Sequence, residues 1–361
     1  MKLTLPPLLL LVFLLSSCGD DTEPQPYALI LDEQGLKNSA RIIGDTEGNA
    51  VIMSVINEDG NEDIRVRKMN PEGHILWERT YGTSSDDVAN TIIQTSDGNH
   101  LIGGFTHDSL NRDDEDFYLL KLDKDGNVLW EKIFGNDDPS RNLISLDQID
   151  NLYEGEDGTL YLAILAQNLN RNGDFGPGVI AIDSQGEELW QQAYFQLGIN
   201  PSSITYSNQQ LFIFNRTNLI VADMDGNIQQ SIRLVDTKAI HNPGILTHND
   251  QLLTASRNRL ISVTKQGEIV EELIFDRDVR ITRIRRGSSG YILSGYVEVD
   301  DLNRPAIFLV DANLQLIEEK IFTASLQAEM NDASLIGERI FCVGDYKPTQ
   351  GLRSTLFLEI F

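Results

Sequence analysis

The chain has 361 residues, of which 29 are Lys or Arg and 55 are Asp or Glu, so its formal net charge at pH 7 is -26. Proteins that bind nucleic acids depend on basic surfaces that neutralise phosphate groups, so this charge argues against that class. A chain of this length ordinarily corresponds to two domains, but internal repeats change that count.

Residues 1–17 have the features of an export signal. Met1 and Lys2 form a short basic start, and an apolar segment follows from Leu3 to Leu15. This segment is shorter than the roughly 20 apolar residues that span a bilayer, and it fits the hydrophobic region of a secretory signal peptide. We therefore predict that residues 1–17 are removed during export.

The segment Leu15-Ser16-Ser17-Cys18 resembles the lipobox of bacterial lipoproteins. This resemblance implies that the Cys18 thiol is acylated, for example with palmitate, and that it anchors the chain to the lipid bilayer. Each buried methylene contributes about 0.8 kcal/mol, so several acyl chains hold a protein firmly. The alternative is an ordinary secretory peptide that happens to contain a cysteine. Cys342, the only other cysteine, lies in an apolar run and is expected in the core.

Residues 18–26 are predicted to form a flexible acidic tether, stiffened by Pro24 and Pro26. The acidic residues Asp20, Asp21 and Glu23 directly follow the predicted lipidation site. Such a cluster resembles the surface-export signal of lipoproteins in some Gram-negative bacteria. That resemblance implies an outer-membrane protein displayed at the cell surface, and the alternative is a solvated tether without such a role.

Residues 27–361 contain a repeated unit with strand character. Residues 64–82 align without a gap with residues 117–135, and a third copy spans residues 179–190. In each copy an apolar run is followed by a turn that ends in Gly, and then by Leu-Trp. Asp or Asn caps such a turn and Gly supplies a positive φ, so the unit predicts a hairpin. Weaker copies without the Trp occupy residues 219–228, 260–269 and 307–316.

A second hairpin signal gives four strands per unit. It is clearest at Asp97-Gly98-Asn99 and returns at Asp157-Gly158-Thr159 and Ser289-Gly290. Strand-built periods of about 40 to 60 residues are typical of propeller blades. Six complete units begin near residues 40, 88, 151, 201, 243 and 279, and a seventh begins near Asp332 but lacks its fourth strand.

The missing strand is predicted at the other end of the chain. Residues 27–31 lie in the register of a fourth strand, and pairing them with the C-terminal strand would remove exposed sheet edges. We therefore predict an all-β, seven-bladed β-propeller with four-stranded blades, formed by residues 27–361 as one domain. Six or eight blades are the alternatives, because the repeats between residues 195 and 260 are the shortest.

Two groups of residues recur at equivalent places in the repeat. Trp77, Trp130 and Trp190 stand at one position per unit, which predicts that they pack between blades. Small residues fall on the second strands, where neighbouring blades are expected to crowd one another: Gly103, Gly104, Ser294 and Gly295.

The unit Asp-x-x-Gly-x-x-Leu-Trp resembles the repeats of bacterial β-propeller lipoproteins of mostly uncharacterised function. One such propeller acts as a non-enzymatic scaffold in the assembly of outer-membrane proteins. The unit is also similar to the Trp-docking repeat of quinoprotein dehydrogenases, which carry a quinone cofactor over a metal site. The cysteine pair and the metal-ligand set of those enzymes are missing from this sequence, so we predict no cofactor and no metal.

The first strand of the sixth unit carries a candidate ligand site. Five arginines cluster there against the acidic background: Arg277, Arg280, Arg283, Arg285 and Arg286. First strands line the channel of a propeller, and alternation would put Arg283 and Arg285 on one side of the strand, with Arg280 and Arg286 on the other. We predict that Arg283 and Arg285 contact an anion or an acidic glycan, and internal ion pairing is the alternative.

Function is inferred mainly by exclusion. The sequence contains no nucleophile motif, no phosphate-binding loop and no metal-ligand spacing among its five histidines, so no catalytic residue is predicted. We favour a membrane-anchored, surface-exposed binding or scaffold module for a glycan or protein partner, with no nucleic acid bound. The alternative is a glycan-active hydrolase or lyase, or a quinoprotein-like oxidoreductase, with its site at the channel mouth.

Overall fold

The computed structural model describes the greater part of the repeated region. The described residues are 28–31, 37–58, 60–107, 115–135, 146–168, 174–195, 197, 201–215, 218–234, 244–246, 249–256, 258–299, 302–322, 327–347 and 354–359. The predicted signal peptide, Cys18 and the tether lie outside these residues. No helix within the described ranges has the length and apolar character needed to cross a membrane.

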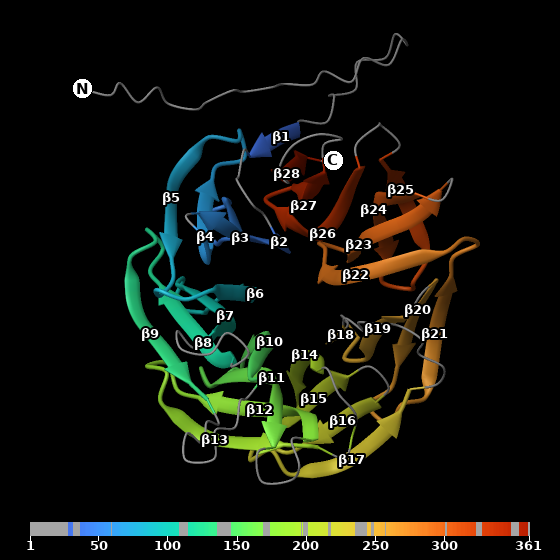
Figure 1. Ribbon diagram of the computed structural model, residues 1–361. Helices are drawn as coiled ribbons and strands as arrows, with labels where there is room; N and C mark the ends of the chain where they lie inside the picture. The colour runs from blue at the N-terminus through green and yellow to red at the C-terminus, as the bar shows by residue number, and fades with distance from the viewer. Residues whose placement is uncertain are drawn as a thin grey trace.

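Within these residues the strands pair into seven antiparallel sheets of four strands each, arranged in a ring around a central axis (Figure 1). The expected all-β propeller architecture with four-stranded blades is therefore confirmed. Six sheets use four consecutive strands: β2 (Lys37–Gly44), β3 (Ala50–Glu58), β4 (Asn61–Met69) and β5 (Ile75–Tyr81); β6 (Asp87–Gln94), β7 (His100–His107), β8 (Glu115–Leu122) and β9 (Val128–Phe134); β10 (Gln148–Glu154), β11 (Leu160–Asn168), β12 (Asp174–Ile182) and β13 (Glu188–Ala193); β14 (Pro201–Ser207), β15 (Gln210–Asn215), β16 (Asn218–Ala222) and β17 (Ile228–Arg233); β18 (Gly244–Leu246), β19 (Leu252–Ser256), β20 (Arg259–Val263) and β21 (Ile269–Ile274); β22 (Val279–Arg286), β23 (Gly290–Val299), β24 (Leu302–Asp311) and β25 (Leu316–Ile321).

The remaining sheet joins the two ends of the chain. It contains β26 (Gln327–Ile336), β27 (Arg339–Lys347), β28 (Ser354–Glu359) and β1 (Ala28–Leu31), in the order β1-β28-β27-β26. Strand β1 runs antiparallel to β28, with Ile30 opposite Leu356. The N-terminal strand thus takes the fourth place in the last blade, which is the place that the repeat register predicts for it.

The turn between the third and fourth strands explains the acidic part of the repeat. The Asp123 carboxylate accepts hydrogen bonds from the backbone N–H groups of Asp125 at 2.9 Å and Asn127 at 2.7 Å. Gly126 has a φ of 79°, a conformation that favours glycine. Asp183, Asp223 and Asp311 cap their turns in the same way. Among the residues that the structure describes, no group of three or more His, Cys, Asp or Glu side chains is placed to hold a metal ion.

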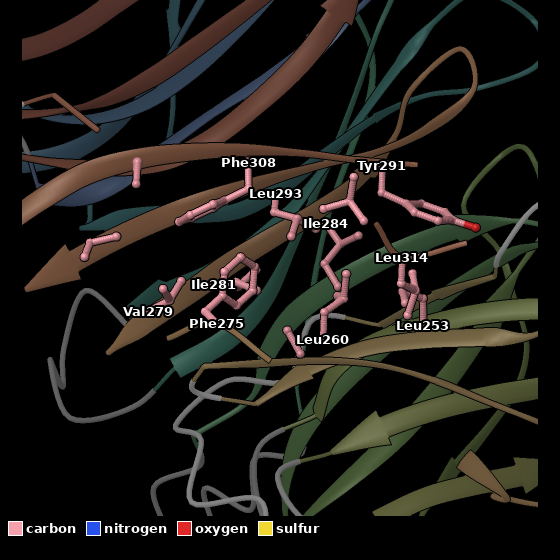
Figure 2. Packing of buried hydrophobic residues seen from close by; sticks show 14 residues of the cluster. Leu253, Leu260, Phe275, Val279, Ile281, Ile284, Tyr291, Leu293, Phe308 and Leu314 are labelled. Carbon is pink, nitrogen blue, oxygen red and sulfur yellow. The ribbon is translucent and has the colours of Figure 1, made fainter. Parts of the chain in front are cut away.

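The hydrophobic core is divided into layers between neighbouring blades. The described residues form seven clusters of buried apolar side chains, and each cluster draws on two adjacent sheets. Figure 2 shows the layer where Leu260 of β20 faces the sheet that contains Phe308 of β24. There the rings of Phe275 and Phe308 lie 4.8 Å apart between centroids. Cys342 belongs to another of these layers and is fully buried, as predicted.

The repeated tryptophans pack between blades, as predicted. The indole N–H of Trp77 donates to the carbonyl of Lys124 at 3.2 Å, in the turn of the next blade. A Cβ atom on Gly226 would lie 2.5 Å from the ring of Trp190. Each tryptophan therefore lies against the glycine turn of its neighbour, and the Trp and the Gly of the repeat are two halves of one contact.

The small residues on the second strands have two different causes. A Cβ on Gly103 would lie 2.8 Å from Ile149 of the next blade, which is the crowding expected from the sequence. For Gly104 the obstacle is instead the carbonyl oxygen of Val88 at 1.9 Å, and for Gly295 it is that of Arg280, also at 1.9 Å. These two glycines make room for the first strand of their own blade, which bulges toward them.

We expect Gly226→Ala to destabilise the protein more than Gly158→Ala. Both glycines have a positive φ, 78° and 83°, so both substitutions carry a backbone cost of about 1–2 kcal/mol. Only at Gly226 must the new methyl group also displace Trp190, because nothing lies within 4 Å of a Cβ on Gly158. Urea unfolding should show the difference, and it should vanish in a Trp190→Ala background.

A chain that begins at Lys37 lacks β1 and leaves the edge of β28 unpaired. We expect this chain to unfold at a lower temperature than the longer one and to self-associate, because an exposed strand edge is a template for pairing. Thermal unfolding and light scattering measure the two effects. An unchanged midpoint together with a monomeric mass would contradict the role of β1 in closing the ring.

Candidate functional site

The innermost strands of five blades contain a one-residue β-bulge at the same place. The register shifts lie between Ala89 and Thr91, Ile149 and Asn151, Pro201 and Ser203, Ile281 and Arg283, and Met330 and Asp332. Strand β2 has a longer irregularity that ends at Arg41. A bulge re-aims the side chains that follow it. These bulges therefore determine which residues face the channel.

The first paired residue after each shift forms a ring around the channel: Arg41, Thr91, Asn151, Ser203, Arg283 and Asp332. Three of them accept a hydrogen bond from a backbone N–H of the next blade: Asn151 from Ile204 at 3.3 Å, Ser203 from Gly244 at 2.8 Å, and Asp332 from Ile42 at 3.3 Å. At these three positions the ring residue links adjacent first strands. Arginine has only donors, so Arg41 and Arg283 depart from this structural pattern.

A cavity of about 720 Å³ occupies the channel inside this ring. Its wall includes five of the ring residues: Arg41, Thr91, Asn151, Ser203 and Arg283. The cavity extends to the turns that follow the first strands, where Glu156, Asn208 and Asp250 line it. This volume falls within the range of small-molecule sites, roughly 300–1,000 Å³.

The arginines predicted from the sequence have different surroundings. Arg283 and Arg285 both line the cavity, and so does Arg286, which the alternation had put on the opposite side. The bulge at Thr282 does not explain this, because Arg283, Arg285 and Arg286 all follow it in regular pairing. Arg286 is the exposed last residue of β22. Arg280 instead donates to the Tyr296 hydroxyl at 2.8 Å. Farther away, Arg277 pairs with Asp276 at 2.9 Å and with Glu319 at 3.3 Å.

Arg285 forms an internal ion pair. Its Nη2 lies 2.6 Å from Oδ2 of Asp332, and its Nε donates to Oδ1 at 3.2 Å. Burial lowers the pKa of Arg285, but the Asp332 carboxylate raises it, and the net shift is upward. Asp332 is fully buried and also accepts from Ile42, so it connects β22, β26 and β2. Arg285 therefore serves the structure, as the ion-pairing alternative expected.

Arg283 has no such partner. Its side chain makes no hydrogen bond and no ion pair to any residue in the described part of the chain. Charges that act on it come from Asp332, Arg285 and Asp150. Burial lowers the pKa of Arg283, because a guanidinium cation loses hydration inside the channel wall.

Asp150 is the carboxyl group that faces these cations. It is the extra residue of the bulge in β10 and interacts electrostatically with Arg283 and Arg41. Burial raises the pKa of Asp150 to about 7, although the two arginines act in the opposite direction. Near neutral pH, Asp150 therefore carries only part of a negative charge and neutralises the arginines incompletely.

Hydroxyl and amide groups occupy the wall contributed by β10 and β14. Tyr153, Thr205 and Tyr206 line the cavity beside Asn151 and Ser203. Burial raises the pKa of Tyr153, while Arg286 and a hydrogen bond with Thr205 partly offset this effect. Such groups both donate and accept hydrogen bonds, and the tyrosines add apolar ring surface.

Sequence reasoning missed Arg41, Asp150 and Asp332 as residues of the channel. A signal for the two ring residues was present, because aligning the first strands of the repeats puts Arg41, Arg283 and Asp332 in one column. The bulge that turns these residues toward the channel is a feature of backbone pairing, and no particular residue type predicts it. His241 and His248, which were interpreted as surface or channel residues, lie outside the described residues.

Comparisons with known proteins support the fold alone. No family model and no curated protein matches the sequence. The chain is similar to the solved structure of BBS1N in complex with ARL6DN, soaked with mercury, with a TM-score of 0.56 and 8% identity over 92% of this chain and 96% of that one. A protein of unknown function from Bacteroides caccae (TM-score 0.49, 11% identity, 82% and 94% covered) and BamB from Moraxella catarrhalis (0.47, 12%, 92% and 94%) are more distant in structure.

We expect Asp332→Asn to lower the free energy of unfolding by about 3 kcal/mol, because it leaves the Arg285 cation without its counter-charge in the channel wall. Asp276→Asn is the matched control, since its carboxylate pairs with Arg277 but is 83% exposed. Exposed pairs of this kind contribute little. Urea unfolding compares the two variants, and equal effects would show that the Asp332 pair is unimportant.

The stability of Asp150→Asn relative to the unchanged protein should rise with pH. The folded-state pKa of Asp150, about 7, lies above the ordinary value of 3.8, so the folded protein binds more protons than the unfolded one between these values. The stability contribution of neutral Asp150 is therefore complete below about pH 4 and is lost as the pH rises through 7. The thermal unfolding midpoints of both proteins from pH 4 to pH 8 measure this difference in stability. If the two midpoints change in parallel with pH, the raised pKa of Asp150 is contradicted.

Proposed function

We propose that this chain is a seven-bladed propeller lipoprotein, anchored through Cys18 in the outer membrane, that acts at the cell surface as a binding module rather than an enzyme. The lipobox-like segment and the acidic residues after it support the anchor and the location. The channel cavity supports the binding role, and it is the observation on which the proposal depends.

The cavity lies where the repeat departs from its structural pattern. Asn151, Ser203 and Asp332 use the ring position to connect blades, whereas Arg41 and Arg283 cannot accept these hydrogen bonds. Placing an arginine at such a position gives up a link between blades. A ligand in the cavity would offset this loss, because it provides acceptors for the guanidinium group of Arg283.

A saccharide fits this cavity better than a protein surface does. The walls are formed by the first strands of six blades and by the turns that follow them, so a ligand must enter the channel mouth end-on, as a chain terminus or a small molecule does. Tyrosine rings, hydroxyl groups and amides line the wall, which suits a ligand with many hydroxyl groups and a partly apolar ring face.

The enzyme alternative requires two carboxyl groups that act on one bond. Among the carboxylates that line the cavity, Asp250 is held by Lys265 at 2.6 Å and by the Ser207 hydroxyl at 2.5 Å. A carboxylate bound in this way is a poor proton donor or nucleophile. This arrangement favours binding over hydrolysis.

A glycan array combined with a pull-down from outer-membrane extracts tests the binding role on delipidated protein. We expect glycan binding that Tyr206→Ala abolishes and Tyr296→Ala leaves intact. Both tyrosines lie on propeller strands and are partly buried, but only Tyr206 lines the cavity. A protein that captures neither glycans nor a protein partner would refute the proposal.

The anchor is tested separately in cells. Metabolic labelling with a palmitate analogue should mark the chain, and Cys18→Ser should abolish the label. Protease added to intact cells should degrade a surface-displayed protein and spare a periplasmic one.

A further inference from the structure

We propose that the channel cavity binds an acidic saccharide, whose anionic group is held by the guanidinium groups of Arg41 and Arg283 beside Asp150. This inference rests on the proposed function and adds the chemical class of the ligand. The shared chemistry is a carboxylate or a sulfate ester on a sugar ring, which are two sources of the same planar or tetrahedral anionic oxygens.

The two arginines flank one blade. Arg283 comes from β22 and Arg41 from β2, and the sheet that begins with β26 stands between them (Figure 1). All three strands present their ring residue at the same level, and Asp332 of β26 lies between the two cations. Asp332 is already engaged by Arg285 and by the N–H of Ile42. Arg41 and Arg283 therefore face the cavity on either side of Asp332, whose carboxylate is already paired with Arg285.

The charge of the wall favours an anion. Four arginines line the cavity, Arg41, Arg283, Arg285 and Arg286, and Arg285 is paired with the buried Asp332. The lining carboxylates are Glu156 and Asp250, and the latter is paired with Lys265. This concentration of cations stands in a chain whose formal net charge is -26. A positive site inside an acidic protein attracts an anion only where the walls shield it from the acidic exterior, as a channel does.

Arg283 forms no hydrogen bond or ion pair with the described residues. Its side chain is only partly exposed in the channel wall. A partly buried guanidinium group gains free energy from a partner that pairs with it and accepts its hydrogen bonds. A bidentate carboxylate or sulfate matches its fork of donors and would satisfy it.

Asp150 provides the second line of support. It interacts electrostatically with both Arg283 and Arg41 from behind the cavity wall, which Asn151 lines in its place. Its pKa of about 7 leaves it partly protonated at neutral pH, so it competes only weakly with an entering anion.

The remaining wall is suited to the sugar ring. Tyr153 and Tyr206 pack partly against the apolar layer between their blades and contribute their remaining surface to the cavity, where Asn151 and Thr205 add polar groups for hydroxyls. The saccharide thus contacts cations on the β2 and β22 side of the channel and uncharged polar groups on the β10 and β14 side. A bare inorganic anion would use only the first of these two sets.

Isothermal titration tests the inference with the full propeller domain and three probes: a glucuronate-containing disaccharide, a sulfated disaccharide and their neutral parent. We expect at least one acidic probe to bind about tenfold more tightly than the neutral parent, the effect of one charge-assisted bidentate contact. Whether carboxylate or sulfate binds more tightly identifies the source of the anion. Inorganic sulfate should bind more weakly than either acidic saccharide.

Two substitutions in the site should change the affinity for the acidic probes in opposite directions. Arg283→Gln should weaken the acidic probes about tenfold and leave the neutral parent unchanged. Asp150→Asn should strengthen the acidic probes severalfold, because it removes the competing negative charge. Arg280→Gln, outside the cavity, should change nothing. If Arg283→Gln fails to fold, Arg283→Lys keeps the charge, loses the bidentate contact and should show an intermediate loss.

The outcomes separate this inference from the proposed function. Equal affinity for acidic and neutral probes, unaffected by the Arg283 and Asp150 substitutions, would overturn the anion site while the cavity remains a glycan site. Binding of inorganic sulfate as tightly as the acidic saccharides would also overturn it. Failure of every glycan on the array, together with an empty pull-down, would instead remove the proposed function itself.

Discussion

Each blade of this protein depends on two neighbours, because its apolar faces are buried only between sheets. The seven hydrophobic clusters of the described residues all lie at such boundaries, including the one that joins Ile42 of the first full blade to Phe341 of the last. A four-stranded sheet with two unburied faces would not be stable alone. Closure of the ring is therefore a condition for stability, and the pairing of β1 with β28 provides the last strand.

The same boundaries carry specific contacts at three radii. On the outside, Trp77 and its equivalents pack on the glycine turn of the next blade. In the middle, aliphatic and aromatic side chains fill the layer between the sheets. At the channel, Asn151, Ser203 and Asp332 connect neighbouring first strands by side-chain-to-backbone hydrogen bonds. Buried polar groups that find partners in this way specify one arrangement of the blades.

The candidate site occupies the positions where this inner connection is interrupted. Arg41 and Arg283 stand where other blades have a hydrogen-bond acceptor, and a cavity lies between them and the tyrosines of β10 and β14. The same ring position therefore either links neighbouring blades, as a hydrogen-bond acceptor does, or provides a side chain for a ligand, as an arginine does. The interruption places arginines in the cavity wall of a chain whose formal net charge is -26.

Local chemistry made much of the fold predictable. The Asp-x-x-Gly turns, the Leu-Trp that follows them and the small residues opposite the first strands each reflect a short-range requirement, so a repeat could be found and its strands counted. Even the place of residues 28–31 followed from register. The site was predictable only in part, because Arg283 and Arg285 stood out by charge while their different roles did not.

The sequence by itself determined the strands, the turns and the tryptophan contact, since these depend on residue types at fixed spacing. Only the tertiary structure decided that Arg285 is bound to Asp332, that Arg286 lines the cavity, and that Asp150 faces Arg41 from another blade. Such relations join residues far apart in the sequence: Arg285 and Asp332 are 47 positions apart, and the hydrogen bond from Ile42 to Asp332 joins residues 290 positions apart. They depend on bulges and ring closure, which place distant strands at one level of the channel and leave no mark in any single repeat.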